Sequence, residues 1–449
     1  MECTRCGVLL NIISKIMLLL KKPLFIILSV LLLSCLTYNF QIADAHKYEA
    51  SGDAWSFVNL GFSLAKTGKY GTINATRDSL IADFKSNSIE NKTYHFSKHI
   101  TWRPPIWPFL IASVFTLFGY SLSYLLIFKF CLHLLGIYLF YKTLKLLNFK
   151  DGLIIIGTFL YGIHPTWQIY SRFFLSEPVT FFFLTLFIYY FIRFAKNKSS
   201  ILPQAIVSGI LILAHPYYIF FPFSIWIVFF LYKSMNIKQL LLSGFICSLI
   251  VFSWVLRNAL VLDTSTPVLT TSSGAVMAKG WNKNVVEEHT NTKGDLANEE
   301  LVLEDYPHDK TAFHNEVTRS KLYTKASLHF IKNNPKQIVP IILTKLKSAF
   351  NPFPETSKPG ILELGRVFFQ LISLLALLAL IFISKNKLIK SLAIGLILST
   401  IGIAIITYSG FRFRMPQIGL ELLLILVCVQ GIQNYYAIKN KPRQIDFKQ

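Results

Sequence analysis

Acidic residues are scarce in this sequence, and charge of either sign is sparse. The 449 residues include 23 Asp and Glu against 45 Lys and Arg, a formal net charge of +22, and charged residues make up only 15% of the chain. A soluble globular protein normally carries more charge than this. Because hydrophobic residues make up 53% of the chain, the composition excludes an ordinary soluble globule and indicates a polytopic membrane protein.

Cysteine is also rare, and its placement gives no sign of a disulfide framework. Four of the six cysteines lie within apolar runs: Cys35, Cys131, Cys247 and Cys428. Cys3 and Cys6 form a single CxxC with no second pair, which is a weak metal signal.

Several motifs of soluble enzymes are missing. The sequence has no Walker motif, no dinucleotide-binding fingerprint and no serine nucleophile elbow. If the protein transfers a chemical group, a soluble nucleotide is therefore not expected to supply that group. His95 and His99 have helical i, i+4 spacing, but no Glu of the zincin type lies between them and no further ligand is evident. We therefore assign no metal ligand from the sequence.

Long apolar runs are abundant, and they approach the roughly 20 residues that cross a bilayer. We expect about ten spans, near 23–40, 121–141, 153–168, 178–194, 201–215, 216–232, 239–256, 361–383, 388–408 and 417–434. The first run is too long for a secretory signal and lacks a small-residue cleavage site, so we expect it to remain as an anchor. A run from Pro104 is short and begins with two prolines, which favours an interfacial or re-entrant segment.

Positive charge lies in the short links between apolar runs, which indicates membrane topology rather than nucleic-acid binding. Lys21 and Lys22 predict a cytosolic N-terminus. If the run from Pro104 does not span, every later basic link is cytosolic as well: 142–150, 193–198, 233–238, 385–390 and 439–443. The polar motifs then share the external face: SGDAW, TWRPP, HPTWQIYSRFFLSEP, AHPYY, WVLRN and GFRFRMP.

The predicted fold is an all-α polytopic membrane protein with both termini in the cytosol. Residues 1–440 are expected to form the transmembrane module, with large external loops at 41–120 and 257–360. Residues 441–449 would form a cytosolic tail, without a separate soluble domain.

Each external loop is predicted to carry an interfacial helix. In the first loop, polar and apolar positions recur at helical spacing before a stop at Gly68. The polar positions are Ser56, Asn59, Ser63 and Lys66, and the apolar positions are Trp55, Val58, Phe62 and Ala65. In the second loop, the apolar piece at 333–353 is too short to span and carries Lys345 and Lys347.

Asp53 stands at the N-terminus of the first of these helices, and two roles are open for it. Asp is among the best residues for capping the free amides of a helix start. A carboxylate there can also act as a general base that takes the proton of an attacking hydroxyl. The two roles are compatible because a carboxylate has two oxygens.

Three external arginines are candidates for binding a lipid-linked phosphate, which suits the forked guanidinium. Arg103 precedes two prolines, whose fixed geometry would hold it at the membrane surface. Arg412 and Arg414 lie between two apolar runs, against the usual charge bias. The alternatives are a headgroup anchor for Arg103 and pairing with loop acids for Arg412 and Arg414.

Glu177, Arg257 and Asn258 lie at the external ends of predicted spans and are candidates for substrate binding. Glu177 could accept hydrogen bonds from a sugar, pair with an arginine such as Arg172, or interact with the helix dipole. For Arg257 and Asn258, two roles are open: stabilising a helix end and contacting a ligand.

Five motifs, in this order, resemble the GT-C membrane glycosyltransferases, specifically the family of protein O-mannosyltransferase-like and aminoarabinose-transferase-like bacterial enzymes. They are GDAWSFVNLGFSLAKTGKYG, WRPPIWPFLIASVFTLFG, YSRFFLSEPVTFF, SWVLRNAL and GFRFRMPQIGLELLLIL, and together they extend over nearly the whole chain. The resemblance implies the GT-C fold, in a bacterial inner membrane, with the active site on the periplasmic face.

The resemblance also implies an activity. It is the transfer of a sugar, with inversion, from a polyprenyl-phosphate donor to a glycan, lipid or protein of the cell envelope. The motif match puts the catalytic acid on Asp53 and the lipid-phosphate-binding cation on Arg103. The late arginine motif matches Arg412 and Arg414.

This chain departs from the family at one position. Many members carry Asp-Glu where Ala54 follows Asp53 here, so a second acid is absent or supplied by another residue, such as Asp44 or Glu49. The sequence identifies no cofactor. A divalent cation could gather Asp44, Glu49 and Asp53, although their spacing matches no defined site.

Two rival functions stay open. A transporter or flippase for lipid-linked sugars would need charged residues deep within its spans, and Lys129 is the main candidate. A glycan polymerase or ligase would also work on the external face.

Overall fold

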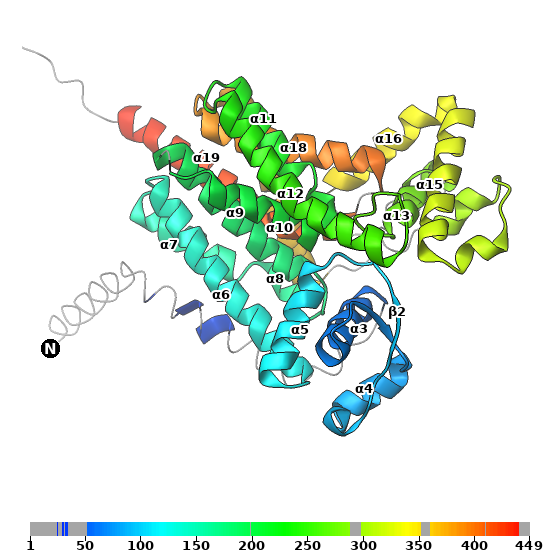
Figure 1. The fold of residues 1–449 in the computed structure, drawn as a ribbon. Helices are drawn as coiled ribbons and strands as arrows, with labels where there is room; N and C mark the ends of the chain where they lie inside the picture. Colours follow the sequence, from blue (N-terminus) through cyan, green and yellow to red (C-terminus); the bar gives the residue numbers. More distant parts are fainter. Residues whose placement is uncertain are drawn as a thin grey trace, which may run out of the picture.

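The computed structural model describes residues 52–197, 199–287, 298–351, 360–408 and 410–439, together with a few residues of the first apolar run. Helices dominate this part of the chain (Figure 1). Its one sheet has two short strands.

Six helices of the described chain are long and apolar enough to cross a membrane. They are α6 (Leu122–Leu146), α9 (Glu177–Asn197), α12 (Ile237–Val261), α17 (Ile361–Ile383), α18 (Lys387–Ile406) and α19 (Ile418–Lys439). Each coincides with a predicted span, so the prediction of a mostly helical chain with several candidate membrane spans is confirmed. The predicted span at 23–40 lies mostly outside the described residues.

Three other predicted spans form shorter helices, so six of the expected spans are confirmed as long apolar helices and the count of about ten stays a prediction. They are α7 (Asp151–Gly162), α10 (Leu202–Ala214) and α11 (Phe221–Leu231). At 1.5 Å per residue, such helices reach about 20 Å, short of the roughly 30 Å hydrocarbon core. Proline explains two of the breaks, because His164 and His215 each precede a proline and are extended there, with ψ of 131° and 108°.

The helices pack into a bundle in which α6 lies against α9, α10 against both α9 and α12, and α11 against α18 (Figure 1). The core of the bundle is a continuous apolar cluster that includes the fully buried Tyr161, Trp167 and Phe181. Exposed apolar side chains, such as Phe245 and Phe252 on α12, cover the outside. Such a surface suits contact with lipid.

The predicted first external loop contains six elements. They are α3 (Gly52–Thr67), β1 (Gly71–Ile73), α4 (Arg77–Lys85), η2 (Ile89–Asn91), β2 (Phe96–His99) and α5 (Ile106–Phe118). The two strands pair antiparallel, with Gly71 opposite His99. The helix α5, which begins two residues after Pro104, has 13 residues, and this length agrees with the prediction that the run is short.

The helix α3 begins and stops as predicted, and Gly68 beyond its end has a φ of +70°. It does not lie on the surface, however, because only Gly52 of its residues is exposed. The hydroxyl of Ser63, on the predicted polar side, donates to the carbonyl of Lys69 at 3.0 Å. Lys66 reaches the carbonyl of Ile89 at 3.1 Å. The polar side is therefore covered by the rest of the loop rather than by water at a membrane interface.

The predicted second external loop begins after α12, so Arg257 and Asn258 belong to that helix. The loop contains α13 (Ser273–Gly280), α14 (Asn284–Glu287), η5 (Glu299–Leu303), η6 (Lys310–Phe313), α15 (Glu316–Asn333) and α16 (Pro335–Phe350). The helix α16 exposes Val339 and Leu343, as an interfacial helix requires. Lys345, expected on its polar side, is buried.

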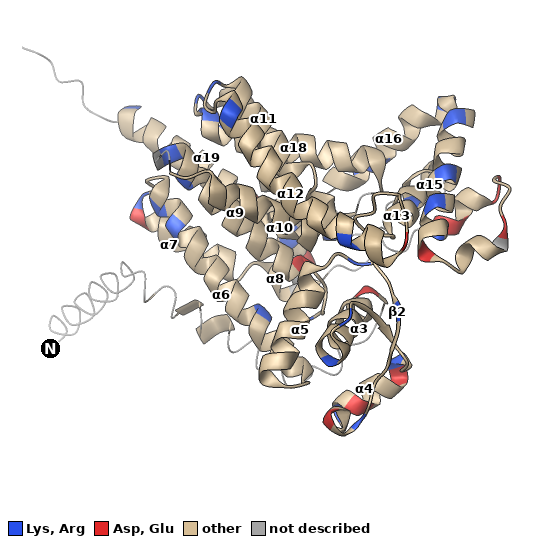
Figure 2. Ribbon diagram, in the orientation of Figure 1, with Lys and Arg blue, Asp and Glu red and all other residues tan. Residues whose placement is uncertain are grey.

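Charge is distributed unevenly over the two ends of the bundle (Figure 2). Lys and Arg occur at both ends, α15 included, but where α6, α9 and α11 end they lie in short links, and the links 142–150, 233–238 and 385–390 contain no acid. Most Asp and Glu lie on α4 and around η5 and α15, at the other end. We call the end of the bundle that carries these links the basic end. Short links that carry Lys without acid are typical of the cytosolic side of a membrane protein.

Candidate active site

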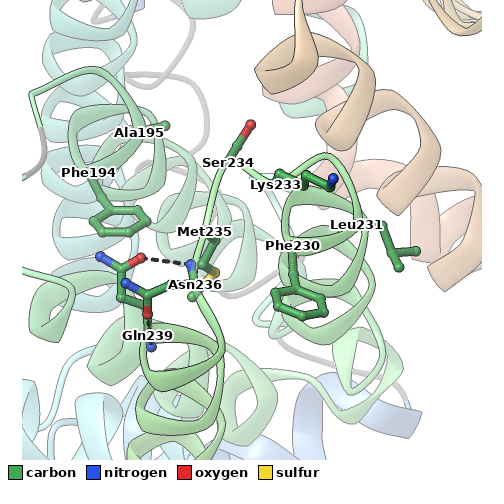
Figure 3. A pocket seen from close by; sticks show the side chains of 9 residues that line it. All are labelled: Phe194, Ala195, Phe230, Leu231, Lys233, Ser234, Met235, Asn236 and Gln239. Atoms are coloured by element: carbon green, nitrogen blue, oxygen red, sulfur yellow. Dashed lines mark hydrogen bonds between the residues drawn. The ribbon is translucent and has the colours of Figure 1, made fainter.

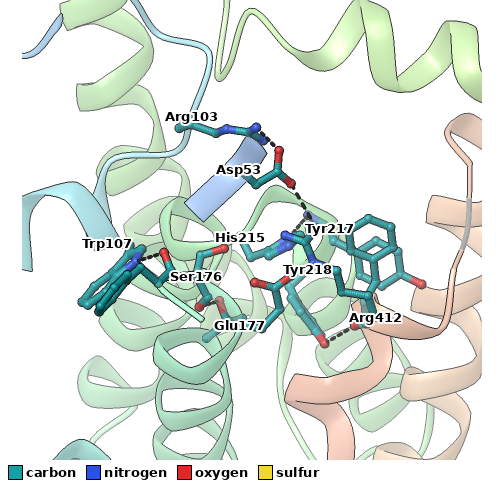
Figure 4. A network of polar contacts seen from close by, with 12 residues as sticks. Asp53, Arg103, Trp107, Ser176, Glu177, His215, Tyr217, Tyr218 and Arg412 are labelled. Carbon is teal, nitrogen blue, oxygen red and sulfur yellow. Dashed lines mark hydrogen bonds and ion pairs between the residues drawn. The ribbon is translucent and has the colours of Figure 1, made fainter. Parts of the chain in front are cut away.

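Four of the predicted site residues form one line of ion pairs (Figure 4). Arg103 donates through Nη2 to Oδ1 of Asp53, and Arg412 donates through Nη1 to Oδ2 of Asp53 at 3.0 Å. Arg412 also donates through Nε to Oε1 of Glu177. The order along the line is Arg103, Asp53, Arg412 and Glu177. Positive and negative side chains therefore alternate, and the net charge of the four is zero.

Asp53 lies in the first turn of α3, where the helix dipole favours an acid. Both of its oxygens are used by arginine, and no backbone amide of the described residues caps onto it. Burial by itself would raise the pKa of Asp53, but the charges and hydrogen bonds of Arg103 and Arg412 outweigh burial and lower it. The side chain is 29% exposed. Asp53 is thus ionised at neutral pH and accessible to a ligand.

Arg103 is positioned by the backbone on both sides of it. Pro104 restricts the residue before it to extended conformations. The hydroxyl of Tyr70 donates to the carbonyl of Arg103 at 2.9 Å. Two residues earlier, the amide of Thr101 donates to Oε1 of Glu316 at 2.7 Å. The segment that carries Arg103 is therefore tied to both predicted external loops.

Glu177 is the first residue of α9 and is fully buried, so it requires a counter-charge. Arg412 supplies that charge from η7 (Phe411–Gln417). The hydroxyl of Tyr218 fixes η7 by donating to the carbonyl of Phe413 at 2.9 Å. Pairing with an arginine was one of the alternatives predicted for Glu177, with Arg172 as the example. Glu177 does pair with an arginine, but the partner is Arg412. Its second oxygen, Oε2, has no hydrogen-bond partner among the described residues.

Asp53, Arg103 and Arg412 line a cavity of about 510 Å³, within the range of small-ligand sites. Most of its wall is apolar or aromatic, including Phe57, Pro104, Tyr217, Phe220, Leu269, Met277, Ile403, Ile406, Tyr408 and Phe413. We call it the apolar cavity. Ile406 is 44% exposed, so the apolar wall continues to the outer surface of the bundle. The charged groups thus meet an apolar ligand space.

Several lining residues were not predicted. Ser176, His215 and Tyr217 border the apolar cavity, and the ring of Tyr217 stacks on Phe413 with centroids 5.2 Å apart. The motif AHPYY contains His215 and Tyr217, and its polarity between two apolar runs was the available signal. That signal does not distinguish a side chain that lines a cavity from one that forms a turn.

Arg414 was predicted to bind phosphate, but it does not reach the apolar cavity. Its Nη2 donates to Oε1 of Glu421 at 2.8 Å, and both side chains are buried. Because the two residues are seven apart on consecutive helical segments, the pair fastens η7 to α19. Of the two late arginines, Arg412 is the one that faces the candidate site.

Arg257 and Asn258 support the site without lining the apolar cavity. The guanidinium of Arg257 lies over the rings of Trp254 and Tyr70 and donates to the carbonyl of Tyr70 at 3.2 Å. Tyr70 in turn holds the carbonyl of Arg103. Asn258 donates to the carbonyl of Val268 at 2.9 Å. Of the two alternatives predicted for these residues, the structure shows contacts that hold neighbouring segments in place, and ligand contact stays a prediction.

The second acid of the candidate site comes from α9. Ala54 is buried in an apolar cluster, so an acid at that position would bury a charge. Glu177 supplies an acid close to Asp53 through their shared Arg412. Asp44 and Glu49, the replacements expected from the sequence, lie outside the described residues. Within the described chain, no three His, Cys, Asp or Glu side chains come together as a metal site.

Lys129 has a structural position in the fold. Its buried ammonium donates to the carbonyls of Ser171 and Phe173 at 2.6 and 2.7 Å. The indole of Trp107 donates to the carbonyl of Phe174 at 2.8 Å. These bonds fix the turn that leads into Glu177. Lys129, the residue that a transporter would use as a charge within the membrane, therefore binds backbone carbonyls in this structure.

A larger cavity, of about 780 Å³, opens at the basic end between α9, α11 and α12 (Figure 3). Lys233 is its charged lining residue, and Asn236 and Gln239 beside it form the capping box of α12. None of the four ion-paired residues borders it, so we do not assign the chemistry to this cavity.

No family model, curated protein or solved structure matches this chain.

Proposed function

We propose that this protein is a membrane glycosyltransferase that uses a polyprenyl-phosphate-linked sugar as donor. The observation that carries the proposal is the meeting of one accessible carboxylate and two guanidinium groups at a cavity whose wall is mostly apolar or aromatic. Arginine binds phosphate through paired hydrogen bonds, and the apolar wall suits the isoprenoid next to it. The cavity is smaller than a whole polyprenyl chain, so most of that chain would lie in the bilayer beyond Ile406.

In the proposed reaction, an acceptor hydroxyl attacks the anomeric carbon of the donor sugar. Asp53 takes the proton of the hydroxyl as the new carbon–oxygen bond forms. The bond between the anomeric carbon and the phosphate oxygen breaks, and its electron pair stays on that oxygen. Arg103 and Arg412 stabilise the charge that develops there. The products are an inverted glycoside and polyprenyl phosphate.

The same ion pairs supply a reason why Asp53 becomes a stronger base when donor binds. Without donor, both guanidiniums lower its pKa, which makes it a weak base. A donor phosphate would compete for Arg103 and Arg412, and each hydrogen bond it takes from Asp53 raises the basicity of that carboxylate. Arg412 would retain Glu177, which holds it in position.

We propose a bacterial inner membrane as the location and its periplasmic face as the side of the reaction, on the basis of the charge distribution and the GT-C resemblance. The acceptor would be a glycan, lipid or protein of the cell envelope. No nucleic acid and no resident cofactor enters the proposal. A polymerase or ligase differs from it only in the product.

The test compares envelope glycans from cells that lack the gene and carry either the wild type or one variant. Asp53→Asn keeps the size of the side chain and removes the base. Asp78→Asn is the matched control, because Asp78 is an exposed acid on α4. Mass spectrometry should find one sugar residue in the wild type and the control that is missing with Asp53→Asn.

Normal glycans with Asp53→Asn, at equal protein levels, would remove Asp53 from the role of base. A transporter is distinguished in liposomes, since it would move a labelled lipid-linked sugar across the bilayer without consuming it. We expect consumption of the donor and release of polyprenyl phosphate instead.

A further inference from the structure

A second cavity, of about 590 Å³, shares Arg103 with the apolar cavity. Its wall comes from α3, the two strands, the segment before α5 and the region from η6 into α15. Trp55, Asn59, Trp102, Glu316 and Arg319 are among its lining residues. We call it the polar cavity. Because Arg103 lines both cavities and holds Asp53, the two ligand spaces meet at the candidate catalytic groups.

Three buried polar atoms without a hydrogen-bond partner among the described residues belong to side chains that line the polar cavity. They are Oδ1 of Asn59, Nε of Arg103 and Nε of Arg319. Buried polar groups are satisfied in the great majority of cases. Three unsatisfied groups around one cavity therefore provide an acceptor and two donors that a polar ligand could use.

The polar cavity also has aromatic side chains in its wall. Trp55 and Trp102 line it from two different segments. The guanidinium of Arg319 lies 4.6 Å from the ring centroid of Trp102 and fixes that ring. Glu316, another lining residue, is tied to the backbone before Arg103 by its bond with Thr101. Aromatic faces next to hydrogen-bonding groups suit a ligand with one apolar face and a polar edge.

A sugar ring has that character, since C–H groups cover one face and hydroxyl groups surround its edge. An acyl chain would leave the unsatisfied groups of Asn59 and Arg319 unpaired, which is unfavourable. A peptide strand binds mainly through backbone hydrogen bonds along a groove or a sheet edge, whereas the unsatisfied groups here belong to three separate side chains. The observed chemistry therefore favours a polar glycan over a lipid tail or a polypeptide.

We propose that the polar cavity binds the acceptor as a glycan, with Trp55 and Trp102 against its sugar rings and Asn59 on its hydroxyls. This inference rests on the proposed function for the direction of transfer. It assigns the acceptor class that the proposed function left open. Arg103 then separates donor phosphate from acceptor hydroxyl, with Asp53 able to reach the proton.

Binding is measured on the full chain in nanodiscs of phosphatidylethanolamine and phosphatidylglycerol. The glycan probe is a set of fluorescently labelled oligosaccharides released by mild acid from the cell envelope, followed by fluorescence polarisation. The lipid probe is undecaprenyl monophosphate, followed by native mass spectrometry. Using both probes separates the two cavities, because each has its own ligand.

Trp102→Ala and Asn59→Leu should each weaken oligosaccharide binding by about tenfold or more, the scale of a central contact, and leave undecaprenyl phosphate binding unchanged. Asn91→Leu is the matched control, because Asn91 is exposed on η2. Arg412→Gln combined with Glu177→Gln, so that no buried acid is left unpaired, should show the reverse pattern. Since Trp102 also packs against a small apolar cluster, Asn59→Leu tests the proposal if Trp102→Ala does not fold.

Four results would overturn the proposal: no oligosaccharide binds the wild type; Asn59→Leu binds it normally; undecaprenyl phosphate displaces it; or a peptide pool from envelope proteins binds instead and depends on Asn59. Glycan binding without any binding of undecaprenyl phosphate would contradict the proposed donor while supporting the polar cavity. Binding of undecaprenyl phosphate without any binding of glycan would contradict the proposed acceptor site and leave the proposed donor in place.

Discussion

Arg412 connects the two acids of the candidate site, and the two connections differ in burial. Asp53 is partly exposed and has Arg103 as a second partner. Glu177 is fully buried, and its ion pair within the described chain is with Arg412. Loss of Arg412 therefore affects Glu177 more severely than Asp53, because a buried charge without a partner is strongly unfavourable.

We expect Arg412→Gln to lower the free energy of unfolding by roughly 3 to 5 kcal/mol, the usual effect of breaking a buried ion pair. Adding Glu177→Gln should restore part of that loss, because the acid left unpaired is then uncharged. Thermal unfolding of the purified protein in detergent, arranged as a double-mutant cycle, measures the coupling. The exposed Arg193, changed to Gln, is the control. Additive effects would mean that the pair is not coupled.

Lys345 is a buried ionisable group with a measurable consequence. Its ammonium lies 3.7 Å from the ring centroid of Trp281 and donates to the carbonyl of Ile405 at 3.2 Å. Burial lowers the pKa of Lys345 to about 6. Between that value and 10.5, the ordinary lysine value, the unfolded chain binds the proton and the folded chain does not. Stability due to this residue therefore rises with pH across the window and is lowest below about pH 6.

Compared with Lys345→Met, the wild type should gain unfolding temperature as the pH rises from about 6 to about 10. At pH 7 the Met variant should be the more stable of the two, because it removes the ionisable group from a buried site. Paired unfolding scans at a series of pH values provide the measurement. A difference that does not change with pH would show that the Trp281 ring keeps the lysine charged.

At the scale of elements, the position of Asp53 depends on how α3 docks on α5. At Gly61 an added Cβ would lie 2.4 Å from Cγ2 of Ile111 and 3.0 Å from the carbonyl oxygen of Pro108. Side chains essentially never approach that closely, so any larger residue must push the two helices apart. Since Arg103 lies just before α5, such a movement would separate it from Asp53.

Gly61→Val should therefore reduce sugar transfer by about tenfold or more, the scale reported for small misplacements of catalytic groups, while the protein stays inserted in the membrane. Gly152→Val on α7 is the matched control, because nothing lies within 4 Å of a Cβ added there. Transfer is followed by the same envelope-glycan analysis. Full activity of Gly61→Val would show that this docking does not set the catalytic geometry.

At the scale of the whole molecule, the candidate site and the basic links lie at opposite ends of the bundle. The ion pairs join α3, α9 and η7 at one end, and the short links that carry Lys without any acid lie at the other (Figure 2). The positive-inside rule then predicts that the site opens on the external side.

Single cysteines in a chain whose six native cysteines are replaced by serine test this orientation. Thr311→Cys and Lys385→Cys are both at exposed positions, one on η6 and one in the link before α18. A membrane-impermeant maleimide should label Thr311→Cys in intact spheroplasts, and Lys385→Cys only after permeabilisation. The reverse pattern would put the candidate site in the cytosol and exclude external transfer.

The sequence by itself predicted the features that depend on local composition. Apolar length gave the six long helices, because the free energy of burying a segment in lipid is a sum over its own residues. The amphipathic pattern and Gly68 gave the limits of α3. Asp53, Arg103, Glu177 and Arg412 were selected as rare charges at the ends of apolar runs, and all four meet in the structure.

Only the tertiary structure decided which charges pair. Arg412 and Arg414 are equivalent in sequence, but they lie on one short helix and point to different acids, Glu177 and Glu421. The polar cavity behind Arg103 also depends on a segment more than two hundred residues away, which carries Glu316. Pairing and enclosure require distances of a few ångströms between remote side chains, and those distances exist only after the helices have packed.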